Sequence, residues 1–144
     1  MVKGRILAID YGETRVGLAL SDPMRIIAAG LTTLIVKNDR DAIRQLLSII
    51  HEQEVSQIIM GLPYDTQGGL SAKAVKIKTF AENLKKETGI PVDFCDERFT
   101  SITAKKMLLE SEQKKKRRSK EKIDTLAAVV ILRHYMDSKQ NSSV

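Results

Sequence analysis

The stretch RILAIDYG, residues 5–12, decides the fold class of this chain. An uninterrupted apolar run that ends in an acid and a glycine is typical of a central strand that is buried on both faces and followed by a turn. Residues 15–21, RVGLALS, predict a second strand that forms a hairpin with the first. Residues 30–36 are rich in β-branched side chains and predict a third strand. The chain is therefore expected to begin as an antiparallel meander.

Beyond the third strand, the hydrophobic period changes to that of helices. Apolar residues between positions 42 and 50 recur at intervals of three and four behind a cap at Asn38 or Asp39, which predicts a helix. The pattern then predicts a strand at 57–61, a helix at 71–86 ended by Gly89, a strand at 91–95, a short helix at 100–109 and a final helix at 120–136. Because a helix precedes each of the last two strands, both should run parallel to the first. The sequence thus predicts an α/β fold with a mixed five-stranded sheet, three antiparallel strands and then two parallel, flanked by helices.

Length and composition indicate one soluble domain. The 144 residues suffice for a single core, which we expect to span residues 1–137, followed by a polar tail at 138–144. Residues 113–119 contain no apolar member and are expected to form a mobile loop. No apolar run is long enough for a membrane span and the start lacks a signal-peptide layout, so we expect a cytoplasmic protein without membrane contact. The single cysteine, Cys95, is expected to be a core residue.

Positive charge is concentrated in one segment. The net charge of the chain is +6. Residues 112–122, EQKKKRRSKEK, hold seven basic residues against two glutamates. Such an excess favours nucleic acid as the partner. A charge run is also compatible with a solvated surface or a binding arm, so it does not distinguish an enzyme from a binding protein.

Acidic residues stand at the ends of predicted strands and at the start of the last helix. Asp10 ends a buried strand, where its desolvation must be offset by hydrogen bonds, an ion pair or a cation. Asp96 and Glu97 follow the fifth strand, and only one of two adjacent strand residues can face a given site. Asp124 lies in the first turns of the final helix. Each also has an ordinary explanation, a turn for Asp10 and the helix dipole for the others.

These acids can converge because the carboxyl ends of parallel strands meet at one edge of a sheet. Three carboxylates without His or Cys are hard oxygen ligands, which suit Mg²⁺ or Mn²⁺ better than zinc. Such a site can hold two ions about 4 Å apart, which activate a water molecule and stabilise the leaving oxygen in phosphodiester hydrolysis. The basic segment would attract the polyanion.

Four ordered motifs resemble those of the YqgF family and span essentially the whole chain. They are Ile9-Asp-Tyr-Gly12 with Arg15-Val-Gly17, Gly61-Leu-Pro63, Asp96-Glu-Arg98 with Thr100, and Lys122-Ile-Asp124 with Ala127-Ala128. The resemblance implies an RNase H-like fold, relatives among Holliday junction resolvases, and a metal-dependent nuclease that trims the 5′ end of precursor 16S ribosomal RNA.

Carried over residue by residue, the resemblance points to Asp10, Glu97 and Asp124 as the acidic site. Many RNase H-like nucleases have an acid at the end of the fourth strand, whereas Gly61-Leu-Pro63 has none. The Asp96-Glu-Arg98 motif must then supply that ligand, and either Asp96 or Glu97 could do so.

The leading hypothesis is therefore an endonuclease of structured RNA that depends on Mg²⁺ or Mn²⁺ and acts in ribosome biogenesis. Asp10, Glu97 and Asp124 would be the catalytic metal ligands. The residues expected to contact nucleic acid are Arg98, Lys114, Lys115, Lys116, Arg117, Arg118 and Lys122.

Three alternatives stay open. The first is cleavage of four-way DNA junctions, which would need a symmetric dimer. An endonuclease of structured RNA could instead act as a monomer or a weak homodimer. A nucleotide-binding module is suggested by the Asp-x-Gly that also follows the first strand of actin-like ATPases. A non-catalytic RNA-binding or ribosome-assembly factor would use only the basic segment.

Overall fold

The computed structural model describes residues 4–63, 69, 71–96 and 120–142. Its elements are β1 (Arg5–Asp10), β2 (Arg15–Ser21), β3 (Ala28–Ile35), α1 (Asp39–Glu52), β4 (Val55–Leu62), α2 (Ala72–Thr88), β5 (Val92–Asp96) and α4 (Lys120–Ser142). The helix predicted at 100–109 and the loop predicted at 113–119 lie outside the described residues. No helix in the described part combines the length and apolar character needed to cross a bilayer.

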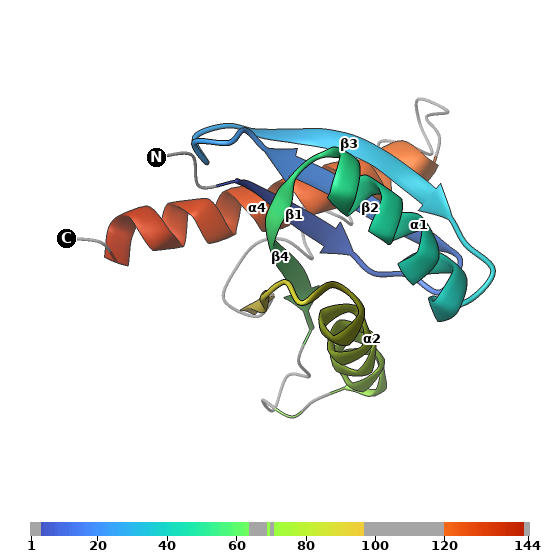
Figure 1. Cartoon of the computed structure of the whole chain (residues 1–144). Coiled ribbons are helices and arrows are strands. Elements are labelled where there is room, and N and C mark those ends of the chain that lie inside the picture. Colours follow the sequence, from blue (N-terminus) through green and yellow to red (C-terminus); the bar gives the residue numbers. More distant parts are fainter. Residues whose placement is uncertain (1–3, 64–68, 70, 97–119, 143–144) are drawn as a thin grey trace.

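The five strands form one sheet in the order β3-β2-β1-β4-β5 (Figure 1). β1 pairs antiparallel with β2, and β2 pairs antiparallel with β3. β4 runs parallel to β1, and β5 runs parallel to β4. The predicted mixed sheet is confirmed, and β1 is its central strand, with five consecutive buried residues after Arg5.

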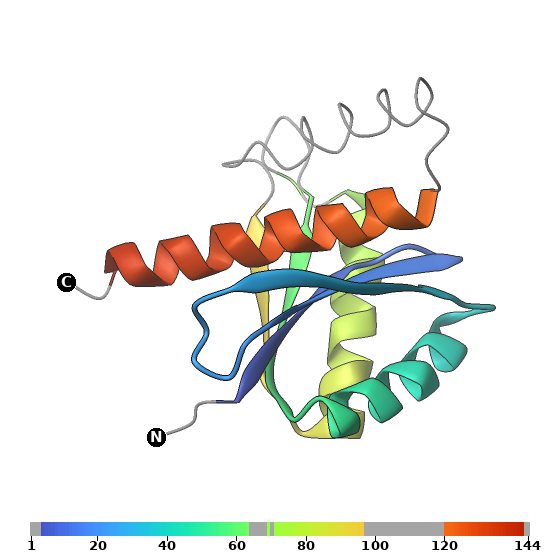
Figure 2. The ribbon, with the colours of Figure 1, turned by 90° about the horizontal axis from the view of Figure 1, so that it is seen from above.

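Helices cover both faces of the sheet. α4 crosses one face, while α1 and α2 lie on the other (Figures 1 and 2). Side chains of β1 alternate between the two layers: Leu7 and Ile9 enter the core under α1 and α2, whereas Ile6 and Ala8 enter the core under α4. Two apolar layers therefore share one central strand, as expected for a strand that is hydrophobic at successive positions.

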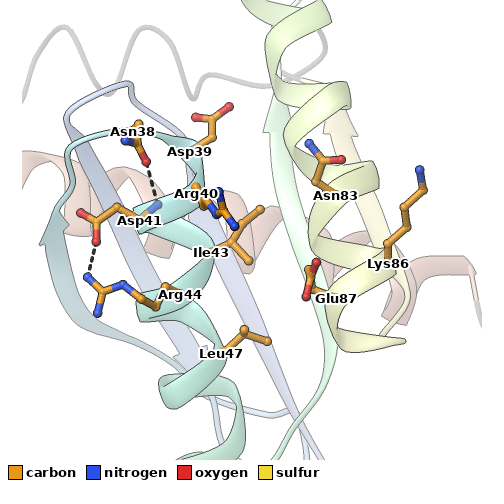
Figure 3. Close-up of a pocket in the computed structure, with 10 residues that line it drawn as sticks. All are labelled: Asn38, Asp39, Arg40, Asp41, Ile43, Arg44, Leu47, Asn83, Lys86 and Glu87. Atoms are coloured by element: carbon orange, nitrogen blue, oxygen red, sulfur yellow. Dashed lines mark hydrogen bonds and ion pairs between the residues drawn. The ribbon is translucent and has the colours of Figure 1, made fainter.

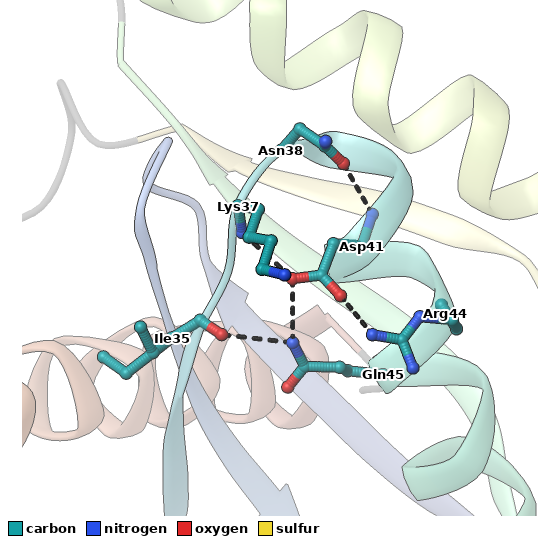
Figure 4. A network of polar contacts seen from close by, with 6 residues as sticks. All are labelled: Ile35, Lys37, Asn38, Asp41, Arg44 and Gln45. Carbon is teal, nitrogen blue, oxygen red and sulfur yellow. Dashed lines mark hydrogen bonds and ion pairs between the residues drawn. The ribbon is translucent and has the colours of Figure 1, made fainter.

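The caps predicted for the helices are present. Asn38 precedes α1, and its side chain accepts a hydrogen bond from the backbone N–H of Asp41 at 2.8 Å. Asp41 also accepts from the backbone of Lys37 and forms an ion pair with Arg44, and Gln45 donates to the carbonyl of Ile35, which connects α1 to the end of β3 (Figure 4). Gly89 ends α2 with φ of +70°, a conformation that glycine adopts without strain.

Some element bounds differ from the prediction. β4 begins at Val55 and ends at Leu62, so it is longer than the predicted 57–61. α4 continues to Ser142, whereas apolar periodicity predicts an end at Met136. The added residues are polar, but the sequence contains no glycine or proline there to end the helix. Cys95 is buried in the core under α4, which confirms its predicted place.

Candidate active site

Asp10 is a buried acid at the carboxyl end of the central strand. Only 8% of its surface is exposed. The alternation along β1 places it on the face of Ile6 and Ala8, which is the face that α4 covers. Across the antiparallel pair, Asp10 lies opposite Gly17 of β2.

Gly17 allows α4 to lie directly against the sheet. A Cβ atom at this position would come within 2.1 Å of the backbone oxygen of Asp124 and within 2.4 Å of its carbonyl carbon. No side chain fits in that space, so the helix backbone at Asp124 packs on the glycine itself. Since Gly17 is also the register partner of Asp10, the two acids are brought to the same place from opposite ends of the chain.

A second contact fixes the start of α4 on the edge strand. The hydroxyl groups of Thr33 in β3 and Thr125 in α4 are hydrogen-bonded at 2.7 Å. Gly30 lies beneath the same threonine, where a Cβ atom would come within 2.6 Å of the Thr125 methyl carbon. The first turns of α4 are therefore held over β2 and β3 by small residues and one hydroxyl pair.

Asp124 is buried like Asp10, with 8% of the residue exposed. Its Oδ2 accepts a hydrogen bond from Nε of Arg15 at 2.8 Å. Within the described residues, its other oxygen, Oδ1, accepts no hydrogen bond. A buried carboxylate oxygen without a donor is a suitable ligand for a cation.

Arg15 contacts the candidate site residue Asp124, and sequence reasoning did not predict this contact. Arg15 is the first residue of β2. Because side chains alternate along a strand, it lies on the same face as Gly17, which follows two residues later. Its partner Asp124 is 109 positions away in sequence. The available signal was the spacing Arg15-x-Gly17, which places an arginine beside the glycine on which α4 packs.

The turn after Asp10 is fastened to the helices on the other face. The Tyr11 ring packs against Phe80 of α2 with 4.9 Å between the ring centres. Its hydroxyl donates a hydrogen bond to Asp39 of α1 at 2.5 Å. Burial, followed by the contact with Asp39, raises the pKa of Tyr11. Glu13, in the same turn, forms an ion pair with Lys76 of α2. These contacts hold the backbone that carries Asp10.

The structure separates Asp96 from the other acids. Asp96 ends β5 opposite Leu62 of β4, whose side chain lies in the core under α1 and α2. Its neighbour Cys95 lies in the core under α4. Asp96 therefore faces the side of the sheet opposite to Asp10.

Several predicted site residues lie outside the described residues. These are Glu97, Arg98 and the basic residues Lys114, Lys115, Lys116, Arg117 and Arg118. Lys122 is described; it is exposed in the first turn of α4, two positions before Asp124. Within the described ranges, no group of three His, Cys, Asp or Glu residues is arranged to hold a metal ion. The described part of the site is thus a pair of acids with one arginine.

A groove of about 840 Å³ lies between α1 and α2 (Figure 3). Residues of the two helices, among them Ile43 and Leu47 of α1 and Asn83 of α2, line it. It opens on the face of the sheet opposite α4, and none of the predicted site residues lines it. The groove is therefore separate from the acidic pair.

The fold is similar to that of known junction resolvases. A structure of RuvC from T. thermophilus in complex with a Holliday junction substrate has a TM-score of 0.61 and 15% identity, covering 96% of this chain and 97% of that one. The Holliday junction resolvase of Fowlpox virus has a TM-score of 0.59 and 11% identity, covering 93% and 99%. These similarities confirm the expected RNase H-like fold.

Curated proteins match at much higher identity. A protein of Koribacter versatilis is 45% identical over 138 residues, which cover 96% of this chain and 90% of that protein. A protein of Clostridioides difficile is 41% identical over 142 residues, which cover 99% of this chain and all of that protein. Both are named "Putative pre-16S rRNA nuclease". The family model described as "RuvX: Holliday junction resolvase" matches residues 4–138. These matches cover nearly the whole chain, including the two acids and the glycine between them. The chain therefore belongs to the RuvX (YqgF) family.

Proposed function

We propose that this protein is a divalent-metal-dependent endonuclease that matures the 5′ end of precursor 16S ribosomal RNA. The observation that carries the proposal is the pairing of two buried acids, Asp10 and Asp124, against the same glycine. Burying an acid is costly unless a partner compensates its charge, so two buried acids placed against one glycine fit a cation site better than a purely structural role.

The class of activity is supported by the family. Membership in the RuvX family confirms the predicted enzyme class, a nuclease. The names of the relatives favour ribosomal RNA as the substrate, and a role in ribosome biogenesis is consistent with them. We place this activity in the cytoplasm.

The residues at the site fit a hard divalent cation. Asp10 and Asp124 offer carboxylate oxygens, and Oδ1 of Asp124 has no hydrogen-bond donor among the described residues. Mg²⁺ and Mn²⁺ prefer such oxygen ligands. When bound, the ion would lower the pKa of a water molecule and stabilise the leaving oxygen.

We propose Glu97 as the third ligand. Asp96 faces the side of α1 and α2, opposite to Asp10. Because side chains alternate along an extended chain, the position after Asp96 is the one expected to return to the face of α4. This argument favours Glu97 over Asp96, which the sequence alone left open.

The basic residues would bind the substrate. Lys122 is exposed beside Asp124, and the segment 112–122 carries most of the net positive charge of the chain. We propose that Lys122, Arg98 and the residues at 114–118 contact phosphates. Such contacts supply affinity and orientation without reading the sequence.

Four-way DNA junctions are the second candidate substrate. The family description and the structural similarity to RuvC favour it. Paired incisions of a junction require a two-fold symmetric dimer, whereas RNA trimming can be done by a monomer or a weak homodimer. Light scattering on the purified protein with and without junction distinguishes the two, since a strict monomer counts against junction resolution.

The central experiment compares variants on both substrates. Wild type, Asp10→Asn and Asp124→Asn are incubated with precursor 16S rRNA and with a synthetic junction, each with Mg²⁺, with Mn²⁺ and with chelator. Asp137→Asn is the matched control, because Asp137 is an exposed acid on the same helix as Asp124. We expect Asp137→Asn to cleave like wild type and both site variants to lose cleavage while still binding nucleic acid. Cleavage by pure Asp10→Asn protein at the wild-type rate would overturn the proposal. A different outcome would indicate a non-catalytic binding factor: cells would lose the function when the charges at 114–122 are reversed, but would keep it with Asp10→Asn.

A further inference from the structure

Arg15 holds one oxygen of Asp124 by a single hydrogen bond. Nε of Arg15 donates to Oδ2 of Asp124 at 2.8 Å. Among the described residues, the guanidinium makes no other hydrogen bond or ion pair, so its two terminal nitrogens, Nη1 and Nη2, have no protein acceptor there. An arginine that clamps a carboxylate firmly uses two parallel N–H bonds. The single bond leaves Arg15 able to exchange its partner.

The carboxylate of Asp124 needs a positive partner at all times. Its side chain is only 11% exposed. A buried charge is costly unless another charge or several hydrogen bonds compensate it. Arg15 provides this compensation in the metal-free protein. A cation bound to Oδ1 of Asp124 would supply the same compensation and draw negative charge from the carboxylate, which would weaken the bond between Oδ2 and Arg15.

The position of Arg15 also suits contact with the substrate. Its side chain is 38% exposed, in contrast to the acid that it pairs with. It begins β2 on the face of Gly17, beside the place where Asp10 and Asp124 meet. A guanidinium with free terminal N–H groups matches the geometry of phosphate oxygens.

We propose that Arg15 has two partners in turn: Asp124 in the metal-free protein, and a backbone phosphate of the nucleic acid once a divalent cation has taken Asp124. This inference rests on the proposed metal-dependent nuclease. It makes Arg15 a substrate-contacting residue whose availability depends on the metal.

The affinity of the substrate-free protein for a metal ion tests the first part of the proposal, that Arg15 pairs with Asp124 until a cation binds. Mn²⁺ is titrated by calorimetry into the full chain as wild type, Arg15→Gln and Arg15→Lys. We expect Arg15→Gln to bind Mn²⁺ roughly two- to fivefold more tightly, which is the range set by a partly exposed ion pair. Arg15→Lys keeps the positive charge and should stay near wild type. Arg133→Gln is the control, because Arg133 is an exposed arginine on α4 that has no hydrogen-bond or ion-pair partner among the described residues, and it should leave the affinity unchanged.

The salt dependence of nucleic-acid binding tests the second part of the proposal, that Arg15 contacts a phosphate once the cation is bound. Affinity for a stem–loop RNA is measured by fluorescence anisotropy at several salt concentrations, in Ca²⁺ and in chelator, with a gel to show that the RNA stays intact. Each phosphate contact contributes roughly 0.7 to 0.9 to the slope of log affinity against log salt. We expect Arg15→Gln to reduce the slope by that amount in Ca²⁺ and to leave it unchanged in chelator, where Arg15 is held by Asp124.

A measurement on wild type covers the case in which Arg15→Gln fails to fold. The Nε–H signal of Arg15 in a nitrogen-15 NMR spectrum, assigned by its loss in Arg15→Lys, should shift on addition of Mg²⁺ because the bond to Asp124 is released. An unmoved signal in protein that binds Mg²⁺ would overturn the inference. So would an Arg15→Gln protein that binds Mn²⁺ no more tightly than wild type. Wild type that binds no divalent cation at all would overturn the proposed function itself, and the two failures are thus distinguishable.

Discussion

Replacing Gly17 by alanine should move the start of α4 and separate the two acids. The new Cβ would lie 2.1 Å from the backbone oxygen of Asp124, whereas ordinary contact begins at 3.4 Å. The helix would have to retreat by about 1.3 Å, the difference between these distances. The obstacle is backbone on both sides, so no side-chain rotation can relieve it.

The expected magnitudes follow from this displacement. Overpacking of this kind destabilises a protein by about 1–3 kcal/mol. A misplacement of about 1 Å in a catalytic group can lower the rate by a factor on the order of 100. We therefore expect Gly17→Ala to unfold at lower urea concentration and to cleave about 100-fold more slowly, while the protein still folds.

Gly30→Ala is the matched control for this prediction. There the new Cβ would meet the methyl carbon of Thr125 at 2.6 Å, and a rotation of that side chain can relieve the contact. The rotation breaks the hydroxyl pair with Thr33, at a cost of about 1 kcal/mol. Gly30→Ala should thus lose some stability and keep its cleavage rate. Equal stability and activity of Gly17→Ala and wild type would refute the placement of Asp124 on Gly17.

Three further predictions concern the surroundings of the site and a distant turn. Tyr11→Phe removes the hydrogen bond to Asp39 and should cost about 1 kcal/mol in urea unfolding at neutral pH. Because burial raises the pKa of Tyr11 in the folded state, wild type should lose stability as the pH rises above about 10, and Tyr11→Phe should lose less; equal losses would contradict the assignment. Backbone hydrogen bonds in the turn after β2 lower the pKa of Asp22, so wild type should lose stability as the pH falls below the ordinary aspartate range. The pKa values of Glu13 and Asp41 are lowered as well, so Asp22→Ala should still lose stability in melting curves across this range, but less than wild type. Lys122→Gln should reduce the salt slope of RNA binding by roughly 0.7 to 0.9, and an unchanged slope would exclude Lys122 from phosphate contact.

Much of the fold follows from hydrophobic periodicity. The run at residues 5–12 predicts a central buried strand, and β1 has this place in the sheet. The change of period after β3 predicts α1, and the caps at Asn38 and Gly89 lie where the chemistry of helix ends requires them. The end of α4 was predicted too early because the pattern of apolar residues stops at Met136, whereas a helix can continue with polar residues until a breaker occurs.

The candidate site residues stay predictions, and the structure describes where some of them lie. Asp10 and Asp124 were recognisable because each is an acid in apolar surroundings, and the structure brings them together. Arg15 was missed because an arginine at the start of a strand is ordinary in sequence, and its pairing with Asp124 joins positions 109 apart. The preference for Glu97 over Asp96 stays a proposal, and it uses the register of β5 against β4, which local sequence patterns do not give.

The most direct test of a cation held by Asp10 and Asp124 is a crystal structure with Mn²⁺, in which anomalous scattering locates the ion. We predict a Mn²⁺ peak about 2 Å from carboxylate oxygens of both Asp10 and Asp124, the distance usual for small divalent ions. A Mn²⁺ peak at another place on the protein, with neither carboxylate within reach, would contradict the account.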